Sequence, residues 1–74
     1  MAVFEVVIRQ AGEETVALRA DEAQTRELLA AKHASHLAHG WSVQSANASG
    51  FVAIKDYACR ARKQREIFIR VSDT

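Results

Sequence analysis

Hydrophobic and polar residues alternate along several short stretches of this chain, the pattern of β-strands that bury one face. Between the second and third of these stretches, residues 22–39 contain no glycine or proline and are rich in helix-forming residues, which predicts one helix. The expected order of elements is therefore β-β-α-β-β-β, with strands at residues 3–9, 15–20, 41–46, 51–58 and 66–71.

Residues at both ends of the expected helix carry terminus signals. Asp21 is suited to cap the first N–H groups, and Gly40 is suited to end the helix in the left-handed conformation, with Trp41 folding back onto the last turn. Leu28 falls on the polar side and does not fit the pattern. The apolar face, which we expect to pack on the sheet, contains Ala23, Leu29, Ala30, Ala34 and Leu37.

These elements predict an α+β fold with two layers, in which one helix packs on a mostly antiparallel sheet of four or five strands. A single domain is expected to cover residues 1–74. The order of elements resembles the β-grasp arrangement of ubiquitin-like domains, which is the alternative fold. The last residues, 71–74, lack the paired glycines of a conjugatable modifier, so the resemblance implies a fold and no modifier function.

Alternation along the strands divides their residues between the two faces of the sheet. One set is almost entirely large and apolar and is expected to form the core with Trp41: Phe4, Val6, Ile8, Val16, Leu18, Val52, Ile54, Ile67, Ile69 and Val71. The other set mixes aromatic, apolar and charged residues: Val3, Glu5, Val7, Arg9, Ala17, Arg19, Phe51, Ala53, Lys55, Tyr57, Phe68 and Arg70. A register shift of one residue would exchange the two faces.

A single helix covers only one face of a sheet, so the second, mixed face needs an explanation. Its aromatic residues are explained in one of three ways. They lie at sheet edges or under loops, they are buried in a homodimer, or they form a platform for a ligand or nucleic acid.

Charge is unevenly distributed along the chain, although the net charge is only +1. Residues 1–31 contain three Lys/Arg and six acids, whereas residues 32–74 contain seven Lys/Arg and three acids. The positive charge is concentrated in a basic hairpin around residues 59–65, which contains Arg60, Arg62, Lys63 and Arg65. Such a segment attracts anions, although solvated hairpin tips often have the same composition.

No residue pattern of an enzyme or a metal site is found in the sequence. His33, His36 and His39 spiral around the helix without a carboxylate or cysteine that completes a site, and no cofactor is expected. Cys59 is the only cysteine, so an intramolecular disulfide is excluded, and no base or glycine-rich elbow accompanies it as a nucleophile.

The sequence therefore favours a small, non-enzymatic binding or regulatory module that acts through the mixed sheet face, with its aromatic and basic residues, and the basic hairpin. Its partner is nucleic acid or another protein. The alternative is a structural homodimer whose mixed face is only an assembly interface. No signal peptide, membrane segment or small-molecule substrate is evident, which predicts a cytoplasmic protein, and the alanine-rich, proline-free composition is typical of a bacterial, phage or mobile-element source. The expected binding residues are Lys55, Tyr57, Arg60, Arg62, Lys63, Arg65, Phe68 and Arg70.

Overall fold

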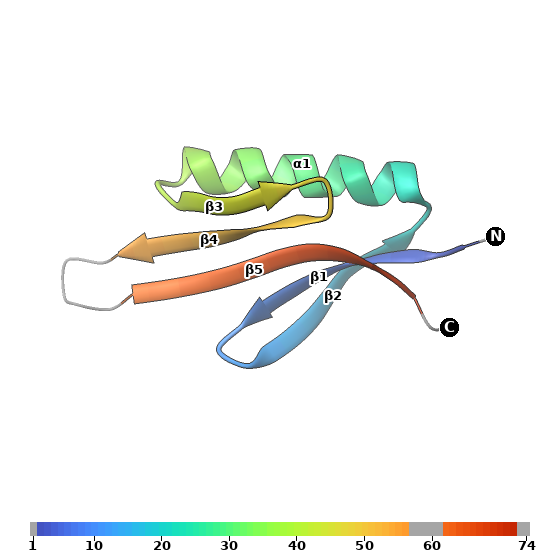
Figure 1. Cartoon of the computed structure of the whole chain (residues 1–74), viewed down its shortest axis with the longest axis horizontal. Coiled ribbons are helices and arrows are strands. Elements are labelled where there is room, and N and C mark those ends of the chain that lie inside the picture. Colours follow the sequence, from blue (N-terminus) through green and yellow to red (C-terminus); the bar gives the residue numbers. More distant parts are fainter. Residues whose placement is uncertain (1, 57–61, 73–74) are drawn as a thin grey trace.

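The computed structural model describes residues 2–56 and 62–72. They form one helix packed on a five-stranded antiparallel sheet, so the predicted α+β class and element order are confirmed (Figure 1). The elements are β1 (Phe4–Gln10), β2 (Glu13–Ala20), α1 (Glu22–Ala38), β3 (Ser42–Asn47), β4 (Gly50–Asp56) and β5 (Arg62–Val71). Within these residues no helix has the length and hydropathy to cross a bilayer.

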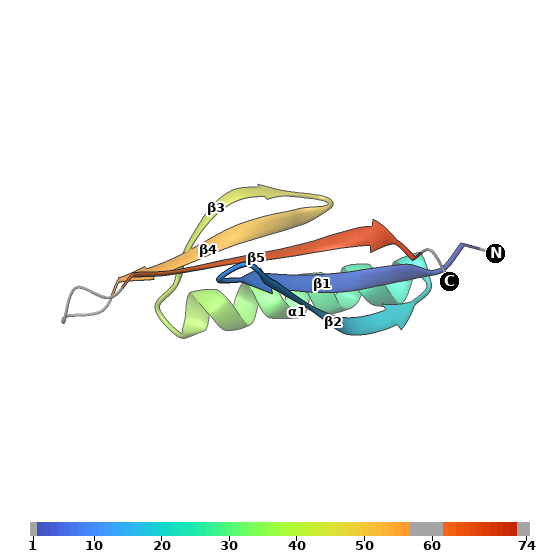
Figure 2. The same cartoon turned by 90° about the horizontal axis from the view of Figure 1, so that it is seen from below.

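The strands lie in the order β2-β1-β5-β4-β3, and every neighbouring pair is antiparallel. The sheet is therefore the plain antiparallel one rather than the β-grasp alternative. Helix α1 follows edge strand β2, crosses one face of the sheet and leads to the opposite edge strand, β3 (Figure 2). In the described part of the chain the other face carries no helix, and we call it the open face.

Both predicted helix ends are confirmed. The Asp21 carboxylate accepts a hydrogen bond from the Gln24 backbone N–H at 2.8 Å. Gly40 has a φ of +84°, and the N–H of Trp41 donates to the His36 carbonyl at 2.9 Å, the bond of a Schellman motif. The Trp41 and His36 rings meet edge to face, 5.1 Å between centroids, which supplies the side-chain contact of that motif.

The helix is rotated relative to the predicted packing face. Leu29 is buried as expected, but Leu37 is 54% exposed and Leu28 packs against the core. Thr25 and His36 are buried instead. Both are polar residues whose hydrogen bonds to backbone carbonyls of their own helix satisfy them, so the hydropathy pattern did not place them inside.

The prediction was also wrong for β4. Phe51 and Ala53, expected on the mixed face, are buried beneath the helix with Val6, Leu29, Trp41 and Ile67. Val52 and Ile54, expected in this core, lie on the open face. The cause is the run of four apolar residues at 51–54, because alternation gives no phase where both faces are apolar.

A β-bulge in β2 accounts for another wrong prediction. Val6 pairs with Leu18, but Val7 pairs with Val16, so Ala17 is an extra residue in β2. Val16 and Leu18, expected on the same face, therefore point to opposite faces. Leu18 packs against the core, whereas Val16 lies on the open face and is 36% exposed.

Strand β5 begins at Arg62 rather than Glu66, so part of the basic segment is strand and not a connection. At its other end, Val71 was expected in the core but is exposed. Gly50 of β4 lies opposite Phe68 of β5. A Cβ at Gly50 would lie only 2.6 Å from the Ile67 carbonyl oxygen, so this close approach requires glycine.

Candidate functional site

A hollow of about 330 Å³ lies at the C-terminal end of α1, where the helix meets β4 and β5. Its lining contains cationic side chains and imidazoles, and no acidic residue is among the lining residues described. They are Lys32, Ser35, His36, His39, Trp41, Lys55 and Arg65, which we call the basic hollow.

Two lining residues of the basic hollow, His36 and Trp41, belong to a group of packed rings. The His36 ring lies edge-on to Trp41 and also to Phe51, with 5.7 Å between the centroids of the latter pair. The Arg65 guanidinium lies over the Trp41 ring, 4.7 Å from its centroid. This cation–π contact holds the guanidinium in place above a buried apolar surface.

Hydrogen bonds fix both ring nitrogens of His36. Nδ1 lies 2.6 Å from the Lys32 carbonyl oxygen and Nε2 lies 3.0 Å from a terminal nitrogen of Arg65. A carbonyl only accepts and a guanidinium only donates, so Nδ1 carries the proton and Nε2 is the acceptor. Burial lowers the pKa of His36 below its ordinary value, and the positive charge of Arg65 adds to this, so both favour the neutral ring.

Arg65 differs from the other arginines of the described residues in its partners. Its Nε donates to the Gln10 side-chain oxygen at 3.1 Å, and its other contacts are His36 and the Trp41 ring. Every other described arginine has a carboxylate within 4.0 Å: Arg9, Arg19, Arg26, Arg62 and Arg70. The positive charge of Arg65 is therefore held by neutral groups, and its two hydrogen bonds use two of its five N–H donors.

Lys55 of β4 contributes a second cation to the basic hollow. Its amine donates to the carbonyl of His39, the C-cap of α1, at 2.8 Å. A cation is favoured there because the last carbonyls of a helix carry partial negative charge. This contact ties the end of α1 to the β4–β5 hairpin.

The end of β4 and the start of β5 adjoin this hollow, since both strands extend past the C-terminal end of α1 (Figure 1). Arg62 and Lys63 are exposed at the start of β5, and Arg62 lies 3.4 Å from the Asp56 carboxylate. Tyr57 and Arg60, also expected to bind, lie outside the described residues.

The two remaining predicted site residues, Phe68 and Arg70, lie on the open face, away from the basic hollow. Phe68 lies under the Arg9 guanidinium, 5.1 Å from ring centroid to Cζ. Arg70 is hydrogen bonded to Glu5 at 2.8 Å and to Glu14 at 3.1 Å. The sheet therefore divides the predicted set, and Lys55 and Arg65 are the members brought together in the hollow.

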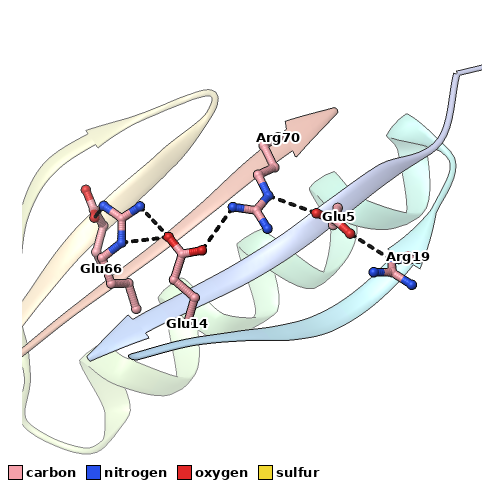
Figure 3. Close-up of polar contacts among 6 residues, drawn as sticks. Glu5, Glu14, Arg19, Glu66 and Arg70 are labelled. Atoms are coloured by element: carbon pink, nitrogen blue, oxygen red, sulfur yellow. Dashed lines mark hydrogen bonds and ion pairs between the residues drawn. The ribbon is translucent and has the colours of Figure 1, made fainter. Parts of the chain in front are cut away.

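An alternating network of charges lies on the part of the open face formed by β2, β1 and β5 (Figure 3). Glu5 receives hydrogen bonds from Arg19 and Arg70, and these hold the pKa of its carboxyl below the ordinary value. Glu14 links Arg70 to Arg9, and Arg9 continues to Glu66 at 2.9 Å. Beneath these side chains Val7 is fully buried, so the apolar part of this face is partly covered by the chain's own charged residues.

Sequence reasoning missed Lys32, His36 and Trp41 as site residues. The one available signal was the i, i+4 spacing of Lys32 and His36 before the Gly40–Trp41 turn, which places both near the helix end. In the described part of the chain, no group of three His, Cys, Asp or Glu side chains is positioned to hold a metal ion.

Comparison of this chain with protein-family models, curated proteins and solved structures finds no match. The function is therefore inferred from the chemistry of the site itself.

Proposed function

We propose that this protein is a non-enzymatic, cytoplasmic nucleic-acid-binding module that contacts phosphates through the basic hollow and the start of β5. The observation that carries the proposal is Arg65, which is held over Trp41 by neutral partners while the other described arginines are paired with carboxylates. A guanidinium without a carboxylate partner, placed in a recess without acidic lining residues, attracts an anion.

Five cations of the described residues supply the contacts in this proposal, and Arg62 does so by exchanging its exposed pair with Asp56 for a phosphate: Lys32, Lys55, Arg62, Lys63 and Arg65. Two of them line the hollow with Arg65, and two extend along the hairpin, a distribution suited to successive phosphates rather than to one small anion. Trp41 is buried under Arg65, so its role is to position the guanidinium and not to stack on a base. Binding of this kind depends little on base sequence.

Trp41 is the only tryptophan of the chain, so its fluorescence reports on the site directly. Titration with single-stranded oligonucleotides should change the emission, with an affinity that falls as salt rises. With five phosphate contacts, the slope of log K against log salt is expected to be about −3.5, from about −0.7 per contact on a single strand.

Charge-neutral variants then test the location of the contacts. Lys32→Gln together with Lys55→Gln should reduce the salt slope by about 1.4, whereas Arg26→Gln should leave it unchanged. Arg26 is a matched control because it lies on the same helix as Lys32 but is paired with Glu22 and does not line the basic hollow. Absence of binding to DNA and RNA at low salt would refute the proposal, and binding only to an acidic protein segment would replace it.

A further inference from the structure

Strand register arranges part of the open face in three rows that cross β2, β1 and β5. Glu5 pairs with Arg19 and with Arg70, which makes a row with charges plus, minus, plus. Arg9 pairs with Glu14 and with Glu66, which makes a row with charges minus, plus, minus.

An apolar row separates these charged rows. Val7 is its centre, with Val16 on β2 and Phe68 on β5 as its direct partners. Val7 is fully buried, whereas Val16 is partly exposed and Phe68 is half-buried, so the apolar surface of this row lies at its two ends, on β2 and β5.

The charge order makes this surface complementary to itself. If a second copy is turned by a two-fold axis that runs across the strands along the apolar row, each charged row lies opposite the other one. Arg19 then meets Glu14 of the second copy, and the same rotation places Glu5 opposite Arg9 and Arg70 opposite Glu66. A two-fold axis along the strands would instead place Arg19 opposite Arg70, which is repulsive.

The charge pairing between the two copies is kept when the sheets are rotated relative to each other, as packed sheets are. Each charged row lies about 7 Å from the apolar row, and packed sheets are rotated by about 30°, which displaces opposing charged residues by about 3.5 Å. Arginine and glutamate side chains are long enough to bridge that offset. Residues in the apolar row lie near the axis, so Val16 stays close to Val16 of the second copy.

We infer that the open face is the interface of a homodimer, in which two copies pack sheet on sheet about a two-fold axis along the Val16–Val7–Phe68 row. Self-complementarity at all six charged positions is what an isologous interface requires. The basic hollow lies on the helix side of the sheet, so dimerisation leaves it accessible, and this inference does not depend on the proposed function.

The test uses the fact that residue 16 faces itself in this dimer. Val16→Lys and Val16→Glu each place two like charges together at the axis, so each variant alone should dimerise at least about tenfold more weakly than the wild-type chain. An equimolar mixture of the two variants places lysine opposite glutamate and should restore a dimer. Sedimentation equilibrium at micromolar concentration measures all three, and circular dichroism checks that each variant is folded.

Leu37→Lys is the matched control, because Leu37 is also an exposed apolar residue but lies on the helix, away from the open face. This variant should dimerise as the wild-type chain does. A wild-type chain that stays monomeric would overturn the inference. Equal dimerisation of Val16→Lys and wild type would also overturn it, and so would a mixture that remains monomeric.

Discussion

Leu29 and Leu37 test the rotation of α1, because they are the same residue type on the same helix with opposite environments. Leu29 is 7% exposed and belongs to the core cluster, whereas Leu37 is 54% exposed. Leu29→Ala removes buried methyl groups and leaves a cavity, which destabilises a protein by about 2–5 kcal/mol. Leu37→Ala removes little buried surface and introduces the best helix former, so its effect should stay within about 0.5 kcal/mol.

Urea unfolding followed by circular dichroism measures both values. Thermal unfolding is a second measurement. In a domain of this size, each 1 kcal/mol of lost stability lowers the thermal midpoint by about 4–8 °C, so the two variants should be clearly separated. Complete unfolding of Leu29→Ala at room temperature would agree with the expectation, because small domains have only about 3–5 kcal/mol of stability. An equal loss of unfolding free energy in the two variants, or a larger loss for Leu37→Ala, would refute the helix rotation described above.

Three further predictions concern backbone and pH. Gly40→Val should lower the thermal midpoint by several degrees, because a φ of +84° is strained for a β-branched residue, and an unchanged midpoint would contradict the Schellman cap. Gly50→Ala should also destabilise, since the new Cβ would meet the Ile67 carbonyl at 2.6 Å; unaltered urea unfolding would show that the strands move apart freely. The folded-state pKa of His36 lies below the ordinary 6.5, so the stability it contributes is complete above pH 6.5 and is lost as pH falls below it. Unfolding curves between pH 7 and pH 5 should show this loss of stability, and His36→Gln should reduce it. The same pH dependence of stability in His36→Gln and in the wild-type chain would assign the loss to other groups.

The parts of the fold that the sequence predicted are those controlled by local chemistry. Asp21 and Gly40 mark the helix ends through contacts made within a few residues, so the pattern indicated them without knowledge of the tertiary fold. The strand faces were harder to predict. The apolar run at 51–54 fits either face, and the bulge at Ala17 changes the phase of β2 without any unusual residue to indicate it.

The candidate site was predicted only in part for the same reason. The basic segment was visible as consecutive charges, which led to Arg62, Lys63 and Arg65. Lys32 and Trp41 join Arg65 only because β5 pairs beside β4 under the end of α1. A site built from three elements depends on tertiary contacts that no local pattern contains.

The position of β5 in the sheet has a consequence for the order of folding. The β1–β2 and β3–β4 hairpins are local in sequence and form quickly, but no strand of one hairpin pairs with a strand of the other. Both pair with β5, which fills the centre of the sheet and contributes the fully buried Ile67. Pairing of β1 with β5 joins residues from the beginning and the end of the sequence, and we expect closure of so long a loop to be the slow step. A nascent chain without β5 therefore has two separate hairpins and an unfinished core, so cooperative folding must wait until β5 has been synthesised.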